Sequence, residues 1–194
     1  MKILIYSEGR VGSHSLGQWL SDELSIPFYQ EMVEINYNVS KDFIQKIYHF
    51  KQNKTVDFNF FDKIIVLYRE NILENAISNI YALKTKKYHH SSNDILDGYY
   101  SITKEFCDEN YIKIIELMTT IKESNKELKK LDKFLILSYE EIFIDNVGQQ
   151  KIENYIGFES KSILANPKLK LRKIDEETSL YLENLIEKNK KKLI

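Results

Sequence analysis

The sequence of 194 residues is poor in cysteine, proline and glycine, with one, two and six of each. Cys107 stands alone, so no disulfide can form within the chain, and this favours a reducing compartment such as the cytoplasm. No apolar run is long enough to cross a bilayer, and no basic stretch ahead of an apolar segment marks a signal peptide. We therefore expect a cytoplasmic protein without a membrane span.

The sequence also lacks an excess of positive or negative charge. The chain carries 28 basic and 29 acidic residues, a formal net charge of −1. This balance gives no electrostatic argument for a nucleic acid or an anionic membrane as partner. The sequence has no zinc-type spacing of cysteine and histidine and no internal repeat, so we expect no metal site. Its length fits one domain over residues 1–194.

The first stretch predicts a strand, a loop and a helix. Residues 3–6 form an apolar, β-prone run, and residues 7–13 form a polar loop. Apolar residues then recur at helical spacing: Leu16, Trp19, Leu20 and Leu24. The loop therefore leads directly into the N-terminus of a helix.

That loop has the chemistry of an anion site. A helix N-terminus exposes unpaired N–H groups and the positive end of its dipole. Gly9 and Gly12 would let the backbone approach an anion, Arg10 offers a planar charged fork, and Ser13 and Ser15 offer hydroxyls. The pattern GxxxxGK[ST] does not fit here. An alternative remains open, in which the glycines serve the turn and Ser13 caps the helix.

A second strand and helix follow the same plan. Residues 63–69 read as a strand covered on both faces, and the residues after Ile72 recur at helical spacing. Arg69 ends this strand, where open parallel sheets bind ligands, and Ser78 lies in the helix. Together they suggest a second anion site. Taken singly, Arg69 also fits a salt-bridge partner and Ser78 a small packing residue.

The rest of the chain alternates in the same way. We expect a strand-like segment over 27–33, a helix over 40–50 that Ser40 begins, a long helix over 93–124 with a break near 108–110, a strand over 133–138, a helix around residues 152–156 and a last helix over 175–192. Alternating apolar strands and helices predict an α/β fold whose central sheet is mainly parallel and flanked by helices in three layers.

At this point the chain resembles sulfotransferases that use 3′-phosphoadenosine-5′-phosphosulfate. Five motifs carry the resemblance in the right order: RVGSHSL at 10–16, close to the RVGSTSL of some bacterial and carbohydrate members; LYRENILENAISNIYA at 67–82; TKKYH at 85–89, similar to a TGxWH run; LSYEEI at 137–142; and LRKI at 171–174 before a last helix. The resemblance implies a three-layer, P-loop-like fold with the phosphosulfate nucleotide as co-substrate and no metal.

The activity that the resemblance implies is sulfuryl transfer from this nucleotide to an acceptor hydroxyl. At the sulfuryl end, charge would be neutralised by Arg10 and by the loop that follows it, namely Val11, Gly12, Ser13, His14 and Ser15. His14 stands where relatives have serine or threonine, so only its backbone N–H would make that contact.

At the other end of the nucleotide, the resemblance assigns the 3′-phosphate to Arg69 and Ser78. Arg172 and Lys173 would close over the nucleotide, although a solvated basic loop explains them equally well. The acceptor is expected to be a small molecule or carbohydrate, with a sugar or glycolipid as default, because the nearest motif versions come from enzymes that sulfate those compounds.

The general base is open. The resemblance points to Glu31, with Glu34 next, and places His89 in a loop that lines the acceptor site. A base must reach the acceptor hydroxyl. His49, expected on a helix, reads most simply as a surface or packing residue.

Two other functions remain open. A P-loop-like small-molecule kinase would need a Lys-[ST] pair and a carboxylate for magnesium at a strand end, and neither is evident. A nucleotide- or phosphate-binding module without catalysis would keep both anion sites and lack the base.

Overall fold

The computed structural model describes residues 1–30, 41–49, 56–85, 102–164 and 174–190. Contacts between Cα atoms divide the chain into two compact units. The first comprises Met1–Asn71 and Lys122–Pro167, and the second comprises Ile72–Ile121 and Lys168–Ile194. Each unit is described by itself.

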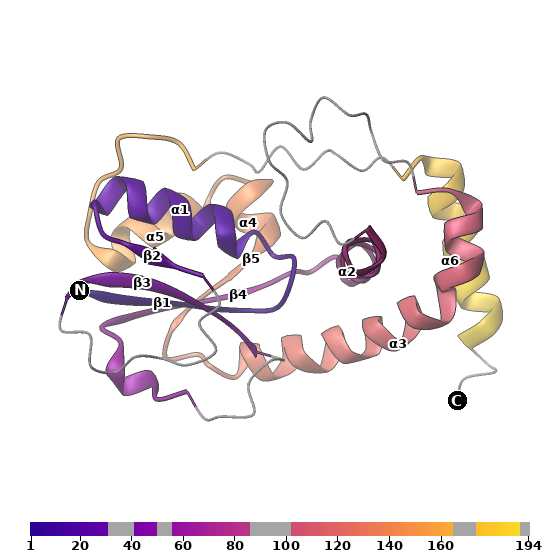
Figure 1. Ribbon diagram of the computed structural model, residues 1–194, viewed down its shortest axis with the longest axis horizontal. Helices are drawn as coiled ribbons and strands as arrows, with labels where there is room; N and C mark the ends of the chain where they lie inside the picture. The colour runs from indigo at the N-terminus through magenta and orange to yellow at the C-terminus, as the bar shows by residue number, and fades with distance from the viewer. Residues whose placement is uncertain (31–40, 50–55, 86–101, 165–173, 191–194) are drawn as a thin grey trace. The chain divides into compact units, whose positions relative to one another are not determined.

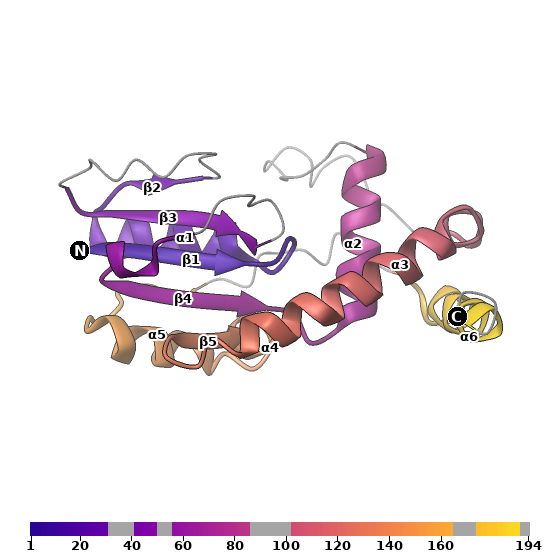
Figure 2. The same ribbon diagram turned by 90° about the horizontal axis from the view of Figure 1, so that it is seen from below.

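The first unit is built on a five-stranded sheet in which every pair of neighbours is parallel (Figure 2). Its strand order is β2-β3-β1-β4-β5. The strands are β1 (Lys2–Ser7), β2 (Phe28–Tyr29), β3 (Phe43–Tyr48), β4 (Lys63–Tyr68) and β5 (Leu135–Ser138). The predicted α/β class with a parallel sheet is confirmed.

Side chains alternate across this sheet and bury a core on each face. Ile3 and Ile5 join the core beneath α1 (Ser13–Leu24), α4 (Tyr139–Phe143) and α5 (Gly148–Ile156). Leu4 and Tyr6 join the opposite core, which also contains Leu128 of α3 (Lys104–Lys129) and the short 3-10 turn η2 (Phe58–Phe60). Figure 1 shows α1 and η2 on opposite sides of the strands. We call these the α1 face and the α3 face.

The predicted helix over 40–50 is wrong, because Phe43–Tyr48 is the strand β3. Phe43, Ile44 and Ile47 do match helical spacing, but every residue from 43 to 47 is buried. A strand covered on both faces normally reads as a continuous apolar run. Here Gln45 and Lys46 interrupt that run, so the sequence conceals the strand.

The other predicted elements are largely confirmed, with shifted ends. The long helix is α3, which begins at Lys104 and runs without the predicted break, while residues 93–101 of the prediction lie outside the described part. At that point Asn110 is buried and its Nδ2 donates to the carbonyl of Phe106 at 2.6 Å, within the helix. The short helix α4 was not predicted; it begins in a capping box formed by Ser138 and Glu141. Of the strand-like segment 27–33, Phe28–Tyr29 is a strand, and residues 31–33 lie outside the described part.

The second unit consists of helices packed on one another. Its core joins residues of α2 (Ile72–Thr85), the first part of α3 and α6 (Glu176–Lys190), including Ile77, Ile114 and Leu182. Cys107 is fully buried in this core. Burial, and then the charge of Asp108, raises the pKa of its thiol to about 11.

Gly12 fixes the turn that leads into α1. Its φ of 76° lies in the left-handed region, and a Cβ atom there would overlap the ring of Phe143 from α4. Phe143 is itself 1% exposed. The turn therefore depends on glycine both for its backbone angles and for the space that the aromatic ring fills.

We expect Gly12→Ala to lower the free energy of unfolding by about 2–4 kcal/mol, because it adds backbone strain and overpacking at once. Gly157→Ala is the matched control, because Gly157 also has a left-handed φ (91°) but nothing within 4 Å of its added Cβ. That variant should lose only about 1 kcal/mol. Urea denaturation of both variants makes the comparison, and equal losses would contradict the role of Phe143.

Candidate functional site

The carboxyl ends of three strands meet at one edge of the first unit. Ser7 at the end of β1 lies opposite Tyr48 of β3 on one side and Leu67 of β4 on the other. The chain goes from β1 to the edge strand β2, comes back to β3 beside β1, and then passes β1 to place β4 on its other side. Such a reversal of strand order is where open parallel sheets bind ligands. The predicted site loop begins at this edge.

The loop between β1 and α1 presents backbone N–H groups. Arg10 (φ 62°) and Gly12 (φ 76°) both take left-handed conformations, a geometry typical of anion-binding nests. Gly12 occupies the N-cap position of α1, and no side chain of the described residues caps that helix. Its first turn contains no acidic residue. Of the alternative, the part in which Ser13 caps the helix is wrong, because Gly12 is the N-cap and Ser13 is already the first helical residue. The part in which Gly12 serves the turn is confirmed.

The two predicted arginines act on one another. Burial lowers the pKa of the Arg10 guanidinium, the nearby Tyr48 raises it, and the positive charge of Arg69 lowers it again. Both arginines belong to the first unit. Two like charges close enough to repel at a partly buried edge favour the binding of an anion between or beside them.

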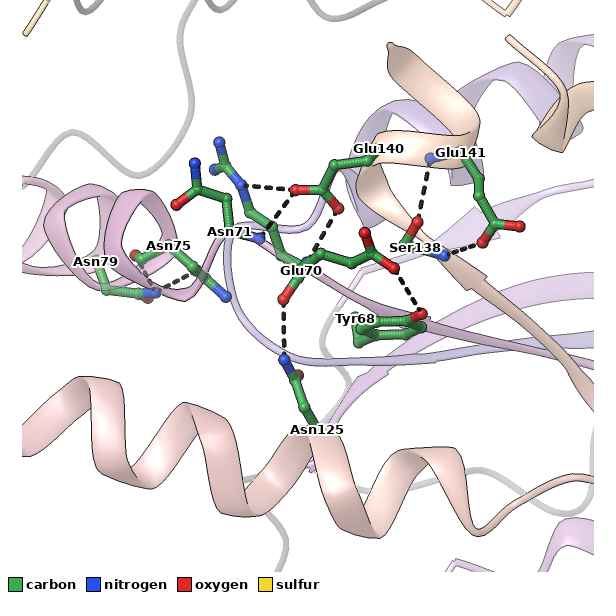
Figure 3. Close-up of polar contacts among 10 residues, drawn as sticks. Tyr68, Glu70, Asn71, Asn75, Asn79, Asn125, Ser138, Glu140 and Glu141 are labelled. Carbon is green, nitrogen blue, oxygen red and sulfur yellow. Dashed lines mark hydrogen bonds and ion pairs between the residues drawn. The ribbon is translucent and has the colours of Figure 1, made fainter. Parts of the chain in front are cut away.

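Arg69 is held in place by structural contacts. Its guanidinium lies 4.6 Å from the centre of the Tyr139 ring, and its Nε is 3.8 Å from Oε1 of Glu140. The carboxylate of Glu140 also accepts from the backbone N–H groups of Glu70 at 3.0 Å and Asn71 at 3.2 Å (Figure 3). The prediction that Arg69 could serve as a salt-bridge partner is therefore confirmed, and these contacts also orient its guanidinium.

The carbonyl of Arg69 is fixed as well. Asn125 of α3 donates its Nδ2 to this oxygen at 2.9 Å (Figure 3). Asn125 is buried, at 7% exposure. The end of β4 is thus tied on one side to α4 and on the other to α3, within the first unit.

A further cation lies on the α1 face, and sequence reasoning missed it. Lys46 of β3 is fully buried, with its Nζ 3.1 Å from Oη of Tyr48 and 4.7 Å from the centre of that ring. Tyr48 in turn acts on Arg10. A helix was expected over 40–50, so neither a buried strand nor a buried lysine within it was anticipated.

The α3 face of the same edge carries an acidic group. Glu8 follows β1 directly, is 1% exposed, and its Oε1 has no hydrogen-bond partner among the described residues. Burial raises the pKa of its carboxyl to about 8. His49, the residue after β3, has its Nδ1 2.7 Å from Oη of Tyr6, and burial lowers the pKa of its ring.

The remaining predicted residues are placed as follows. Val11 is fully buried beneath the loop, and the ring of His14 lies 5.7 Å from that of Phe28. Ser15 is half-buried on α1, and Ser78 is half-buried on α2 in the second unit. The predicted residues outside the described part of the chain are Glu31, Glu34, His89, Arg172 and Lys173.

Within the described ranges, no group of three or more histidine, cysteine, aspartate or glutamate side chains could hold a metal ion. Over the same residues, none of the helices has the length and apolar character that a bilayer crossing requires. Comparison with known proteins found no matching family model and no matching curated protein.

The buried carboxyl of Glu8 should make stability depend on pH. Its pKa is about 8 in the folded chain against an ordinary value of 4.5, so over that interval the folded state holds a proton that the unfolded state has lost. The free energy of unfolding should therefore fall as pH rises through this range, by at most about 1.4 kcal/mol per pH unit.

Glu8→Gln should remove this slope and stabilise the protein at pH 8 relative to the parent. Urea denaturation at pH 5, 6.5 and 8 measures the effect, with Glu116→Gln, at an exposed position of α3, as the matched control. If the free energy of unfolding changes with pH in the same way in the parent and in Glu8→Gln, Glu8 is ionised over this whole pH range.

Proposed function

We propose that this protein is a sulfotransferase that moves a sulfuryl group from 3′-phosphoadenosine-5′-phosphosulfate to an acceptor hydroxyl. The observation that carries the proposal is the pair of strand-end arginines, Arg10 and Arg69, which act on one another beside an uncapped helix N-terminus. A nucleotide with anionic groups at two positions suits two cations and a nest of N–H groups. The sequence resemblance supplies the identity of that nucleotide.

In this proposal Arg10 and the N–H groups of residues 11–15 stabilise the sulfuryl group and the bridging phosphate oxygen. The acceptor oxygen forms a bond to sulfur while the bond from sulfur to the phosphate oxygen breaks, and adenosine 3′,5′-bisphosphate leaves. Lys46 places a buried amino group on the same face of the sheet, where a bound anion would favour its charged form. Positive charge placed where the leaving group gains negative charge lowers the barrier.

The 3′-phosphate is assigned to Arg69, whose guanidinium the Tyr139 ring and Glu140 orient. The parts given to Ser78, Arg172 and Lys173 rest on the resemblance alone. A carbohydrate or glycolipid acceptor rests on it too.

The base remains a proposal with several candidates. Glu31 and His89 come from the resemblance. His49 is a third candidate, because it leaves β3 at the carboxyl edge of the sheet, half-buried, with a hydrogen bond that fixes its ring. Its lowered pKa keeps the imidazole neutral near pH 7, which is the form that can accept a proton.

A nucleotide-binding module without catalysis is the alternative. The ion pair between Arg69 and Glu140 suits this alternative as well, because both functions need the guanidinium to be held. An assay of sulfuryl transfer to a panel of sugars separates the two functions.

We expect Arg10→Ala and Arg69→Ala each to weaken binding of adenosine 3′,5′-bisphosphate by about 10- to 100-fold, because each removes a charged hydrogen-bonding group from the nucleotide. Titration calorimetry measures the affinity. Lys113→Ala, at an exposed position of α3, is the control and should bind like the parent.

The same titration with ATP and with inorganic phosphate tests the nucleotide. The bisphosphate should bind more tightly than either. If both arginine variants bind the bisphosphate as the parent does, the proposed site is wrong. A preference for ATP with a requirement for magnesium would favour the kinase.

A further inference from the structure

We propose that Tyr6, Glu8 and His49 form one acid–base unit on the α3 face of the sheet edge, in which Tyr6 positions the imidazole of His49 and Glu8 supplies its counter-charge. The unit is defined by its geometry. Only the use of His49 as the base in sulfuryl transfer rests on the proposed function.

The sheet brings these three side chains to one face. Side chains alternate along a strand, so Tyr6 and Glu8 leave β1 on the same side. The register pairs Tyr6 with Ile47 and Ser7 with Tyr48. Glu8 and His49 are thus the next residues along two neighbouring parallel strands. Tyr48, which acts on Arg10, points to the other face, so a substrate that lies over the carboxyl edge would have the cations on one side and the acid–base unit on the other.

Tyr6 fixes the ring of His49. Its Oη shares a hydrogen bond with Nδ1 at 2.7 Å, and the two rings meet edge to face, with centres 5.5 Å apart and planes at 89°. Phe58 lies against the other side of Tyr6, with ring centres 5.4 Å apart. Tyr6 is 7% exposed, so it has little freedom to turn away. The hydroxyl therefore determines how His49 presents its second ring nitrogen.

The burial of Glu8 leaves one of its carboxyl oxygens without a hydrogen-bond partner in the part of the chain that the structure describes. A carboxyl group at 1% exposure normally has its oxygens hydrogen-bonded, but Oε1 of Glu8 has no such partner among the described residues. Its charge contributes to the raised pKa of Tyr6, after burial, so the two groups are electrostatically coupled. A buried acid beside a tyrosine–histidine pair suits a counter-charge that becomes useful when the ring gains a proton.

Other charged and titratable groups around this unit come from α3 and β4. Glu127 of α3 raises the pKa of His49 slightly against the larger effect of burial. Lys129 of α3 lies 4.3 Å from the ring centre of Tyr68 on β4. Burial, and then the charge of Glu70, raises the pKa of the Tyr68 phenol to about 12, so it stays protonated. Glu8 is therefore the buried carboxyl of this face, and Glu127 is an exposed one.

In the reaction, the imidazole of His49 takes the proton of the acceptor hydroxyl as its oxygen bonds to sulfur and the bisphosphate departs. The ring becomes positive. Glu8 then favours its carboxylate form and releases its own proton to solvent, so the buried unit as a whole gains no net charge. We expect the two groups to titrate as a coupled pair.

The first test follows the His49 ring directly by NMR, with the signal assigned by its loss in His49→Asn. In the parent, the titration should show two steps, the upper one near the pKa of about 8 that burial gives Glu8. Glu8→Gln should leave one step. Tyr6→Phe should shift the Nδ1 resonance and the pKa of His49, whereas Tyr29→Phe, at an exposed edge-strand position, should change neither.

A single step that is identical in the parent and Glu8→Gln would overturn the counter-charge, and an unchanged Nδ1 signal in Tyr6→Phe would overturn the positioning role. Far-ultraviolet circular dichroism and urea midpoints confirm that each variant is folded. If Tyr6→Phe fails to fold, Tyr6→His tests the same contact. Its ring can form a hydrogen bond in place of the phenol, so the Nδ1 signal of His49 should remain that of a hydrogen-bonded nitrogen.

The second test uses the transfer assay. Tyr6→Phe should lower kcat about 10-fold with an unchanged KM for the phosphosulfate nucleotide, and Glu8→Gln should remove the upper limb of the pH profile of kcat. If the NMR results hold and the protein shows no transfer, the acid–base unit stands and the proposed function falls. If transfer is found but His49→Asn keeps the parental kcat, His49 is not the base.

Discussion

The contact between Phe143 and Gly12 is the constraint on which the sheet edge depends. The aromatic ring occupies the space where any other residue would place its Cβ, so the backbone enters α1 by one route only. This route leaves Arg10 in a left-handed conformation at the carboxyl edge. Strained backbone of this kind persists only where its surroundings hold it, and here α4 does so. The backbone of the loop that carries Arg10 is thus held by a helix that comes much later in the chain.

Beyond that turn, side chains alternate along each strand and so place the polar groups of this edge on two different faces. Lys46, Arg10 and Arg69 lie with the phenol of Tyr48 on the α1 face, and Tyr6, Glu8 and His49 lie on the α3 face. An anion and a proton can therefore be handled within one sheet edge without the acid neutralising the cations. This arrangement keeps the carboxyl of Glu8 buried with a raised pKa. Buried groups whose pKa is strongly shifted cluster at functional sites.

The strands β1 and β4 could be predicted because their apolar runs are unbroken, and the loop after β1 could be predicted from its glycines and arginine. β3 could not, because Gln45 and Lys46 are buried polar residues within it, and burial of a polar side chain depends on neighbours that are distant in sequence. The same holds for Glu8, since a glutamate beside a glycine normally lies in solvent. The arginines were found by their type and position, whereas Lys46 and Tyr6 became visible only when β1 and β3 were paired.

The burial of Cys107 has a practical consequence. Its thiol is fully buried and its pKa lies well above neutral, so it should react slowly with maleimide reagents, because the thiolate is the form that attacks the maleimide. Since the chain has no other cysteine, it is already suited to site-specific labelling. A cysteine introduced at an exposed position of either unit would carry a fluorophore or spin label without background from the native thiol.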